Sequence, residues 1–72
     1  MNDRKGIEIR LGDSVRVHAW RFSGGDAMGE VLSLREGLAL IRFRDRRASS
    51  RGAPHWVAAD SLTVLQRERV RL

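Results

Sequence analysis

The commonest of the side chains in this sequence that can take part in chemistry is the guanidinium group of arginine. Of the 14 basic residues only Lys5 is a lysine. The densest basic stretch consists of Arg42, Arg44, Arg46, Arg47 and Arg51. A guanidinium group binds phosphate through paired hydrogen bonds and also stacks on bases. The stretch therefore predicts a phosphate-binding surface, and the alternative is a solvated strand edge whose charges oppose sheet pairing.

Aromatic side chains are the second candidate for a binding surface. Trp20, Phe22 and Trp56 are three of the four aromatic residues, and the fourth, Phe43, is expected in the core. Trp20 and Trp56 can form a stacking platform for bases or a groove for a peptide. Alternatively, they cover the open ends of a small barrel. We take both as candidate nucleic-acid-binding residues, with Trp56 the stronger candidate.

The sequence offers few candidate residues for catalysis or for metal binding. There is no cysteine, and His18 and His55 are the only histidines, without the spacing of a zinc site. Neither histidine has an evident partner for nucleophilic catalysis. Gly24-Gly25 lacks the following lysine and hydroxyl residue of a phosphate loop. We expect a protein that is not an enzyme and has no catalytic residue, no metal site and no cofactor.

The elements that position these residues are short strands. At 72 residues the chain makes one domain with a small core. Apolar and polar residues alternate over 7–11, and again after the Gly12-Asp13 turn, where Val15, Val17 and Ala19 share one face and Arg16, His18 and Trp20 the other. Further strands are predicted at 29–35, 38–44, 54–57 and 63–66, with a loop at 21–28 and a 3₁₀ turn at 58–62.

Together these patterns predict an all-β, SH3-like small β-barrel of about five strands. We expect a disordered lead-in at residues 1–6, the barrel at 7–66 and a basic tail at 67–72. A tight turn at 35–38 places Gly37 at positive φ. The predicted core consists of Val15, Val17, Val31, Ile41, Phe43, Val57 and Leu62.

Two parts of the sequence resemble known families. Gly12-Asp13-Ser14-Val15-Arg16-Val17 and Gly29-Glu30-Val31 resemble the KOW motif of the NusG C-terminal domain and of ribosomal KOW proteins, and Phe22 falls where the NusG-type pattern has phenylalanine. The match covers under half of the chain. Trp20 replaces the usual glycine, and the loop before Gly29 is about two residues longer. The resemblance implies an SH3-like barrel that binds RNA or a ribonucleoprotein.

The segment around His55-Trp56-Val57 is similar in layout to type II dihydrofolate reductases. Those enzymes need a Val-Gln-Ile-Tyr strand, and this chain has Ala53-Pro54-His55-Trp56-Val57 there and no tyrosine. This departure argues against reductase activity.

The net charge of the chain indicates what kind of partner it binds. The formal net charge of +5 attracts polyanions, although a GC-rich genome also replaces lysine by arginine without functional meaning. We expect a cytoplasmic, non-catalytic module that binds nucleic acid, preferring RNA or single strands. The alternative is a protein-interaction or regulatory module, of the kind carried by phages and mobile elements.

A membrane role is not expected. No apolar run approaches the ~20 residues that span a bilayer, and the N-terminal residues lack a signal-peptide core.

Assembly is the last expectation. Leu32, Leu34, Leu38 and Leu40 crowd two neighbouring strands, which predicts an apolar face and a homodimer, or a larger ring, packed through this hairpin. The alternative is a bulge at Gly29, or a change in the loop to Met28, that shifts the register and buries these leucines.

Overall fold

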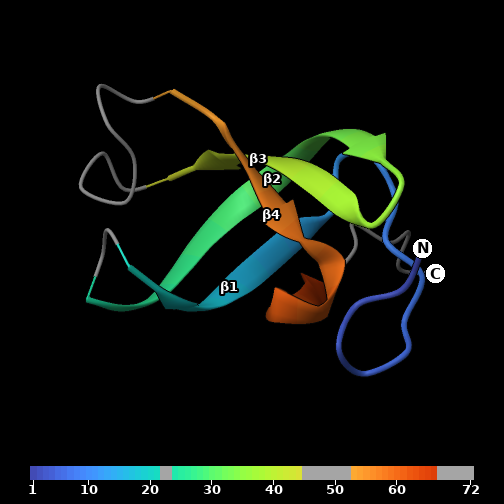
Figure 1. Cartoon of the computed structure of the whole chain (residues 1–72), viewed down its shortest axis with the longest axis horizontal. Coiled ribbons are helices and arrows are strands. Elements are labelled where there is room, and N and C mark those ends of the chain that lie inside the picture. Colours follow the sequence, from blue (N-terminus) through green and yellow to red (C-terminus); the bar gives the residue numbers. More distant parts are fainter. Residues whose placement is uncertain (22–23, 45–52, 67–72) are drawn as a thin grey trace, which may run out of the picture.

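The computed structural model describes residues 1–21, 24–44 and 53–66, which form a single antiparallel sheet (Figure 1). Its elements are β1 (Ser14–Trp20), β2 (Gly25–Arg35), β3 (Leu38–Phe43), β4 (His55–Ala58), the 3₁₀ turn η3 (Ala59–Ser61) and β5 (Leu62–Gln66). The predicted all-β fold of five strands is confirmed. No helix in these described ranges is long and apolar enough to cross a bilayer.

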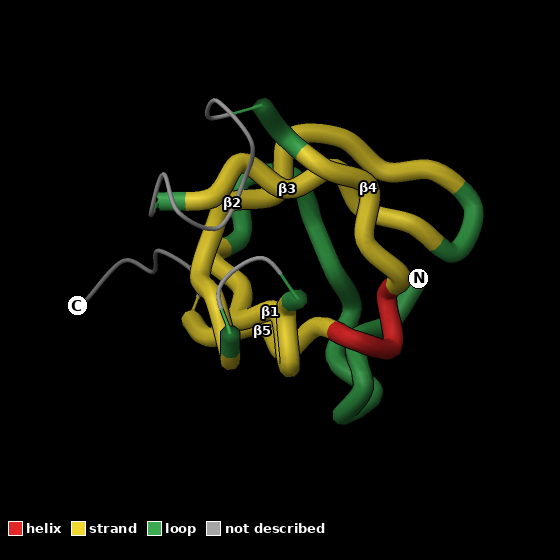
Figure 2. The backbone as a smooth tube through the Cα atoms, turned by 60° about the vertical axis from the view of Figure 1, so that its left-hand side comes forward, coloured by secondary structure: helices red, strands yellow, loops and turns green. Residues whose placement is uncertain are grey.

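The strands curl around a common interior in the order β4-β3-β2-β1-β5 (Figure 2). Strand β2 is the longest, at 11 residues, and pairs with β1 on one side and with β3 on the other. The η3 turn carries the chain from β4 to β5, the two strands at opposite ends of the sheet order. The result is a small barrel-like fold.

Alternating side chains of these strands fill the interior. All seven side chains predicted for the core are buried. They form the central cluster together with five further side chains, namely Ile9, Ala27, Ala39, Ala59 and Val64. Ile41, Leu62, Val15 and Val17 have no exposed surface. Period-2 alternation therefore identified the core correctly.

The expected disordered lead-in at residues 1–6 is not what the structure shows. Asp3 is only 5% exposed, and its carboxylate accepts hydrogen bonds from the backbone N–H groups of Lys5, Ile7 and Val64. The Arg4 N–H also donates to the carbonyl oxygen of Leu62. These contacts fasten the first residues along β5.

The prediction of a strand at residues 7–11 is also wrong. Only an isolated bridge between Asn2 and Glu8 forms there. The chain then turns, with the Arg10 N–H donating to the Asp13 carboxylate and Gly12 at a φ of 85°. Ile9 is buried within the core, whereas Leu11 is exposed. The alternation thus belongs to a loop that places one apolar side chain inside.

A bulge changes the faces at the end of β1. The register with β2 shifts between Val17 and Trp20, and Ala19 has a φ of 52°. The Ala19 N–H donates to the Asp26 carboxylate. Ala19 is therefore exposed and Trp20 is half-buried, which reverses the faces expected from strict alternation.

Strand β2 begins four residues earlier than expected. Residues 25–28 pair with β1 instead of forming a loop. Further along β2, Gly29 packs so closely on β3 that an added Cβ would lie 2.6 Å from the Arg42 carbonyl oxygen. The hairpin to β3 has the predicted positive φ at Gly37, which is 75°.

Candidate nucleic-acid interface

Three arginines from distant parts of the chain share one outer face of the sheet. Arg42 on β3 lies opposite Glu30 on β2, and Glu30 lies opposite Ser14 on β1. Arg16 lies opposite Met28. The backbone N–H of Arg44, the residue after β3, donates to the carbonyl oxygen of the same Met28. Directly paired residues project from the same face. Arg42, Arg44 and Arg16, all exposed, therefore form a basic stripe across β3, β2 and β1.

The arginines of the basic stripe differ in how much charge they leave available. The Arg42 guanidinium lies 2.5 Å from the Glu30 carboxylate, so half-exposed Glu30 offsets part of its charge. The Arg44 guanidinium reaches across β2 and donates to the neutral hydroxyl of Ser14 at 3.0 Å. Among the residues that the structure describes, neither Arg44 nor Arg16 forms an ion pair. These two carry the stripe's free positive charge.

A concave pocket of about 510 Å³ extends the basic stripe beyond β1. Its wall combines the N-terminal loop with the outer faces of β1 and β5, and the lining residues are Arg4, Lys5, Arg16, His18, Thr63, Val64 and Leu65. On its floor the His18 Nε2 lies 2.6 Å from the Thr63 hydroxyl oxygen. The lining contains three cationic groups and no carboxylate, so we call it the basic pocket.

The structure describes only part of the predicted arginine cluster. Arg42 and Arg44 lie on the basic stripe, whereas Arg46, Arg47 and Arg51 lie outside the described residues. The sequence did not single out Arg16, Arg4 or Lys5, which line the basic pocket. Outward alternation did place Arg16 on the solvent face of its strand, but nothing local indicated that the first residues fold back beside it.

Trp20 packs as part of an aromatic cluster at one end of the barrel. Its ring stacks on Phe43 with centroids 5.0 Å apart and meets the edge of His55 at 5.5 Å. Phe43 and His55 contact each other at 6.1 Å. Trp20 thus packs against the core and also lines the groove described below.

Trp56 has a different environment on the outer face of β4. Its side of the sheet also carries Leu40, its direct partner on β3. The ring is partly exposed, and the Arg35 guanidinium carbon lies 4.3 Å from its centroid. This cation–π contact occupies one face of the ring.

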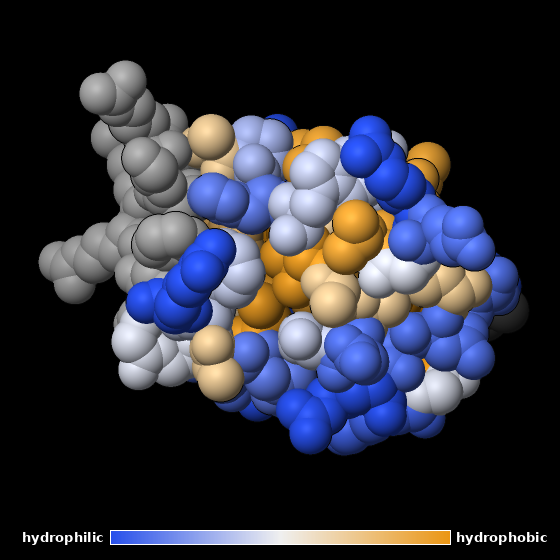
Figure 3. Space-filling model, in the orientation of Figure 1, coloured by the Kyte–Doolittle hydropathy of each residue, from blue (hydrophilic) through white to orange (hydrophobic). Residues whose placement is uncertain are grey.

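A groove of about 290 Å³ separates the end of β1 from β4 and η3. Trp20 and Trp56 both line it, together with His18, Arg21 and Ser61. In the view that places β4 and β1 at the centre, apolar side chains gather there within a hydrophilic surround (Figure 3). The lining of the groove includes one arginine among mostly apolar residues, whereas the basic pocket has three cationic groups.

The four leucines of the β2–β3 hairpin do not form one face. A bulge between Val31 and Ser33 leaves Leu32 exposed, while Leu38 and Leu40 are half-buried. Leu34 lies opposite buried Ala39 and so projects from the other side of the sheet. The smaller apolar area formed by Leu38, Leu40 and Trp56 is called the outer apolar patch below.

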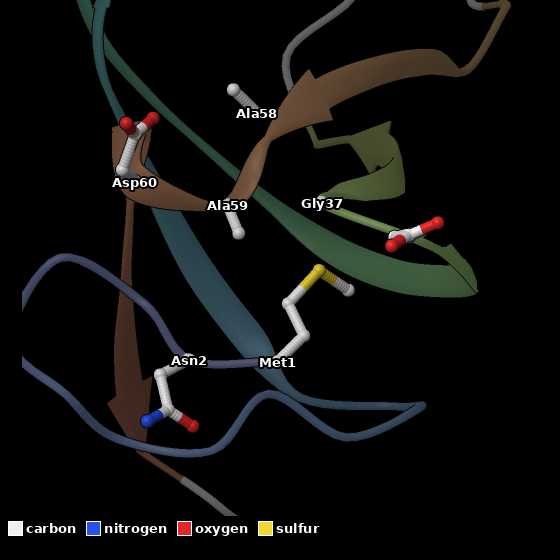
Figure 4. Close-up of a pocket in the computed structure, with 7 residues that line it drawn as sticks. Met1, Asn2, Gly37, Ala58, Ala59 and Asp60 are labelled. Atoms are coloured by element: carbon white, nitrogen blue, oxygen red, sulfur yellow. The ribbon is translucent and has the colours of Figure 1, made fainter.

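A further hollow of about 680 Å³ lies beside the turn of the β2–β3 hairpin, between Met1, Asn2, Gly37 and η3. The Met1 side chain projects into it toward Ala59 and Gly37, and the Asp60 carboxylate points away (Figure 4). The lining of this hollow also includes Glu36 and Ala58.

Metal binding has no candidate in the described ranges, which hold no group of three or more His, Cys, Asp or Glu side chains suited to an ion. Comparison of the chain with models of protein families, with curated proteins and with solved structures finds no match.

Proposed function

We propose that the protein is a non-catalytic nucleic-acid-binding module that contacts the phosphate backbone with its basic stripe. The observation that supports this most is the convergence of Arg42, Arg44 and Arg16 on one face, continued by Arg4 and Lys5 at the basic pocket. Neighbouring β-strands lie about 4.8 Å apart, and β2 lies between β3 and β1. Arginines on β3 and β1 are therefore about 10 Å apart, so they can contact different phosphates of one nucleic-acid strand.

The proposed ligand is RNA or another single-stranded nucleic acid. The described elements include no helix that could fill a major groove, which is the usual way of reading duplex sequence. A sheet face with arginines suits phosphates of single strands or structured RNA. Trp20 stacks on Phe43, and Arg35 covers one face of the Trp56 ring. In this proposal phosphate contacts therefore contribute more to binding than base stacking does.

The test is fluorescence anisotropy with labelled single-stranded RNA, single-stranded DNA and duplex over a range of salt concentrations. Arg16→Ala and Arg44→Ala should each weaken binding several-fold at low salt and reduce the salt slope by about 1. The control is Arg10→Ala, since Arg10 is exposed and lies beside Glu8. Absence of binding at low salt, or equal losses for all three variants, would contradict the proposal.

A second candidate function is protein interaction through the outer apolar patch, with a second copy of the chain as the partner. The patch is bordered by charges of both signs, namely Arg35 and the Arg42–Glu30 pair, which a two-fold related copy can match. We expect Leu40→Lys to stay folded, because its side chain lies on the outer face, and to abolish self-association.

Sedimentation equilibrium at micromolar to high micromolar concentration measures this association, with circular dichroism as the check on folding. A wild-type chain that stays monomeric over the range excludes the dimer. An unfolded Leu40→Lys variant would show instead that the outer apolar patch belongs to the core.

A further inference from the structure

The basic pocket differs from the basic stripe in shape. The stripe lies on the outer face of the sheet, whereas the pocket is hollowed between two segments that are distant in the sequence. Arg4 and Lys5 come from the N-terminal loop, and Arg16 comes from β1. Because the pocket is concave and draws its cations from two segments, it can surround one anionic group more fully than the stripe can.

The loop that supplies Arg4 and Lys5 is held in place by Asp3. The Asp3 carboxylate receives the Val64 N–H at 2.7 Å and the N–H groups of Lys5 and Ile7 at 2.8 Å. The Arg4 N–H adds a hydrogen bond of 2.9 Å to Leu62 on β5. The backbone beside both cationic side chains is therefore fixed before any ligand arrives, which reduces the ordering cost of binding.

The floor of the basic pocket adds polar groups at a defined place. Thr63 is only 8% exposed, and its hydroxyl lies beside the His18 imidazole. On its other side the His18 Nδ1 faces the Asp26 carboxylate at 3.7 Å. The Thr63 hydroxyl can still donate or accept one further hydrogen bond. The pocket thus combines two guanidinium groups, one ammonium group and a hydroxyl.

We propose that the basic pocket binds the terminal phosphate of a nucleic-acid strand, an inference that rests on the proposed nucleic-acid-binding function. A terminal phosphate carries nearly two negative charges and three free oxygens, whereas an internal phosphodiester has one charge and two free oxygens. The terminal group therefore matches three cations and a hydroxyl in one concavity better than an internal phosphodiester does. Arg16 belongs to both surfaces, so a strand anchored in the pocket continues along the stripe toward Arg44.

The experiment compares three versions of one single-stranded RNA sequence, which carry a 5′-phosphate, a 3′-phosphate or hydroxyl groups at both ends. Anisotropy at fixed pH and salt should show about tenfold tighter binding for one phosphorylated end than for the hydroxyl-ended strand. Which end gains identifies the source of the phosphate. Lys5→Ala should remove this preference, because Lys5 lies in the pocket and away from the stripe.

Arg44→Ala is the matched control. It should weaken binding to all three strands by the same factor and leave the preference intact. Equal binding of the three strands overturns the pocket assignment, as does a preference that survives Lys5→Ala. In either case the loss caused by Arg44→Ala still supports the basic stripe, whereas failure of every strand to bind overturns the proposed function itself.

Discussion

Replacement of Gly29 by alanine is expected to destabilise the protein by about 3 kcal/mol, at the upper end of overpacking effects. The new Cβ would lie 2.6 Å from the Arg42 carbonyl oxygen and 2.6 Å from the Ile41 Cγ2. One of these neighbours is backbone in the middle of a strand pair, so it cannot turn away. For a domain of this size the loss lowers the melting temperature by roughly 12–24 °C.

Gly25→Ala is the matched control, because Gly25 begins the same strand and a Cβ there meets nothing within 4 Å. Thermal unfolding of both variants, followed by circular dichroism, gives the comparison. If Gly29→Ala melts within a few degrees of Gly25→Ala, then β2 and β3 do not approach each other as closely as the structure places them.

Gly29 also shows what the sequence could and could not reveal. The glycine before an alternating run marked the second strand, and the alternation assigned Val31, Ile41 and Phe43 correctly to the core. The strand nevertheless starts at Gly25, inside a stretch that reads as a loop. Glycine lowers strand propensity, but pairing with β1 outweighs this local preference.

The basic pocket was hidden for another reason. Asp3 and Val64 are separated by 61 positions, and their hydrogen bond folds the first residues onto β5. Local patterns carry no record of such a contact, so these polar residues read as a disordered lead-in. Arg16 was correctly placed on the solvent face, yet its two cationic neighbours became visible only in three dimensions.

Trp20 illustrates the limit of alternation within a single strand. Its face was predicted from its distance to Val17 along the chain, and a bulge at Ala19 changes that relation. The positive φ of Ala19 is uncommon for a residue with a Cβ. Alternation therefore holds up to His18 and fails from Ala19 on, where the Asp26 carboxylate accepts a hydrogen bond from the backbone.

Loss of the Asp3 carboxylate is the second change with a large expected effect. Asp3→Asn keeps the shape of the side chain, but its amide group directs a donor toward a backbone N–H of Lys5, Ile7 or Val64. Burying an unsatisfied N–H and losing hydrogen bonds to a charged acceptor should cost about 2–3 kcal/mol. Urea unfolding at neutral pH measures it, with Asp60→Asn as the control because Asp60 is exposed on η3.

The pH dependence separates the charge of Asp3 from its shape. Burial opposes ionisation of this carboxyl, but the backbone N–H groups of Val64, Ile7 and Lys5 outweigh burial and lower the pKa of Asp3. The stabilisation is therefore present above the unfolded-state pKa of about 3.9 and is lost as pH falls through the lower pKa of the folded state. The stability difference between wild type and Asp3→Asn should stay constant above about pH 5 and shrink below about pH 4. A difference that is unchanged down to about pH 3 would show that hydrogen bonding to the ionised carboxylate does not hold the N-terminal loop.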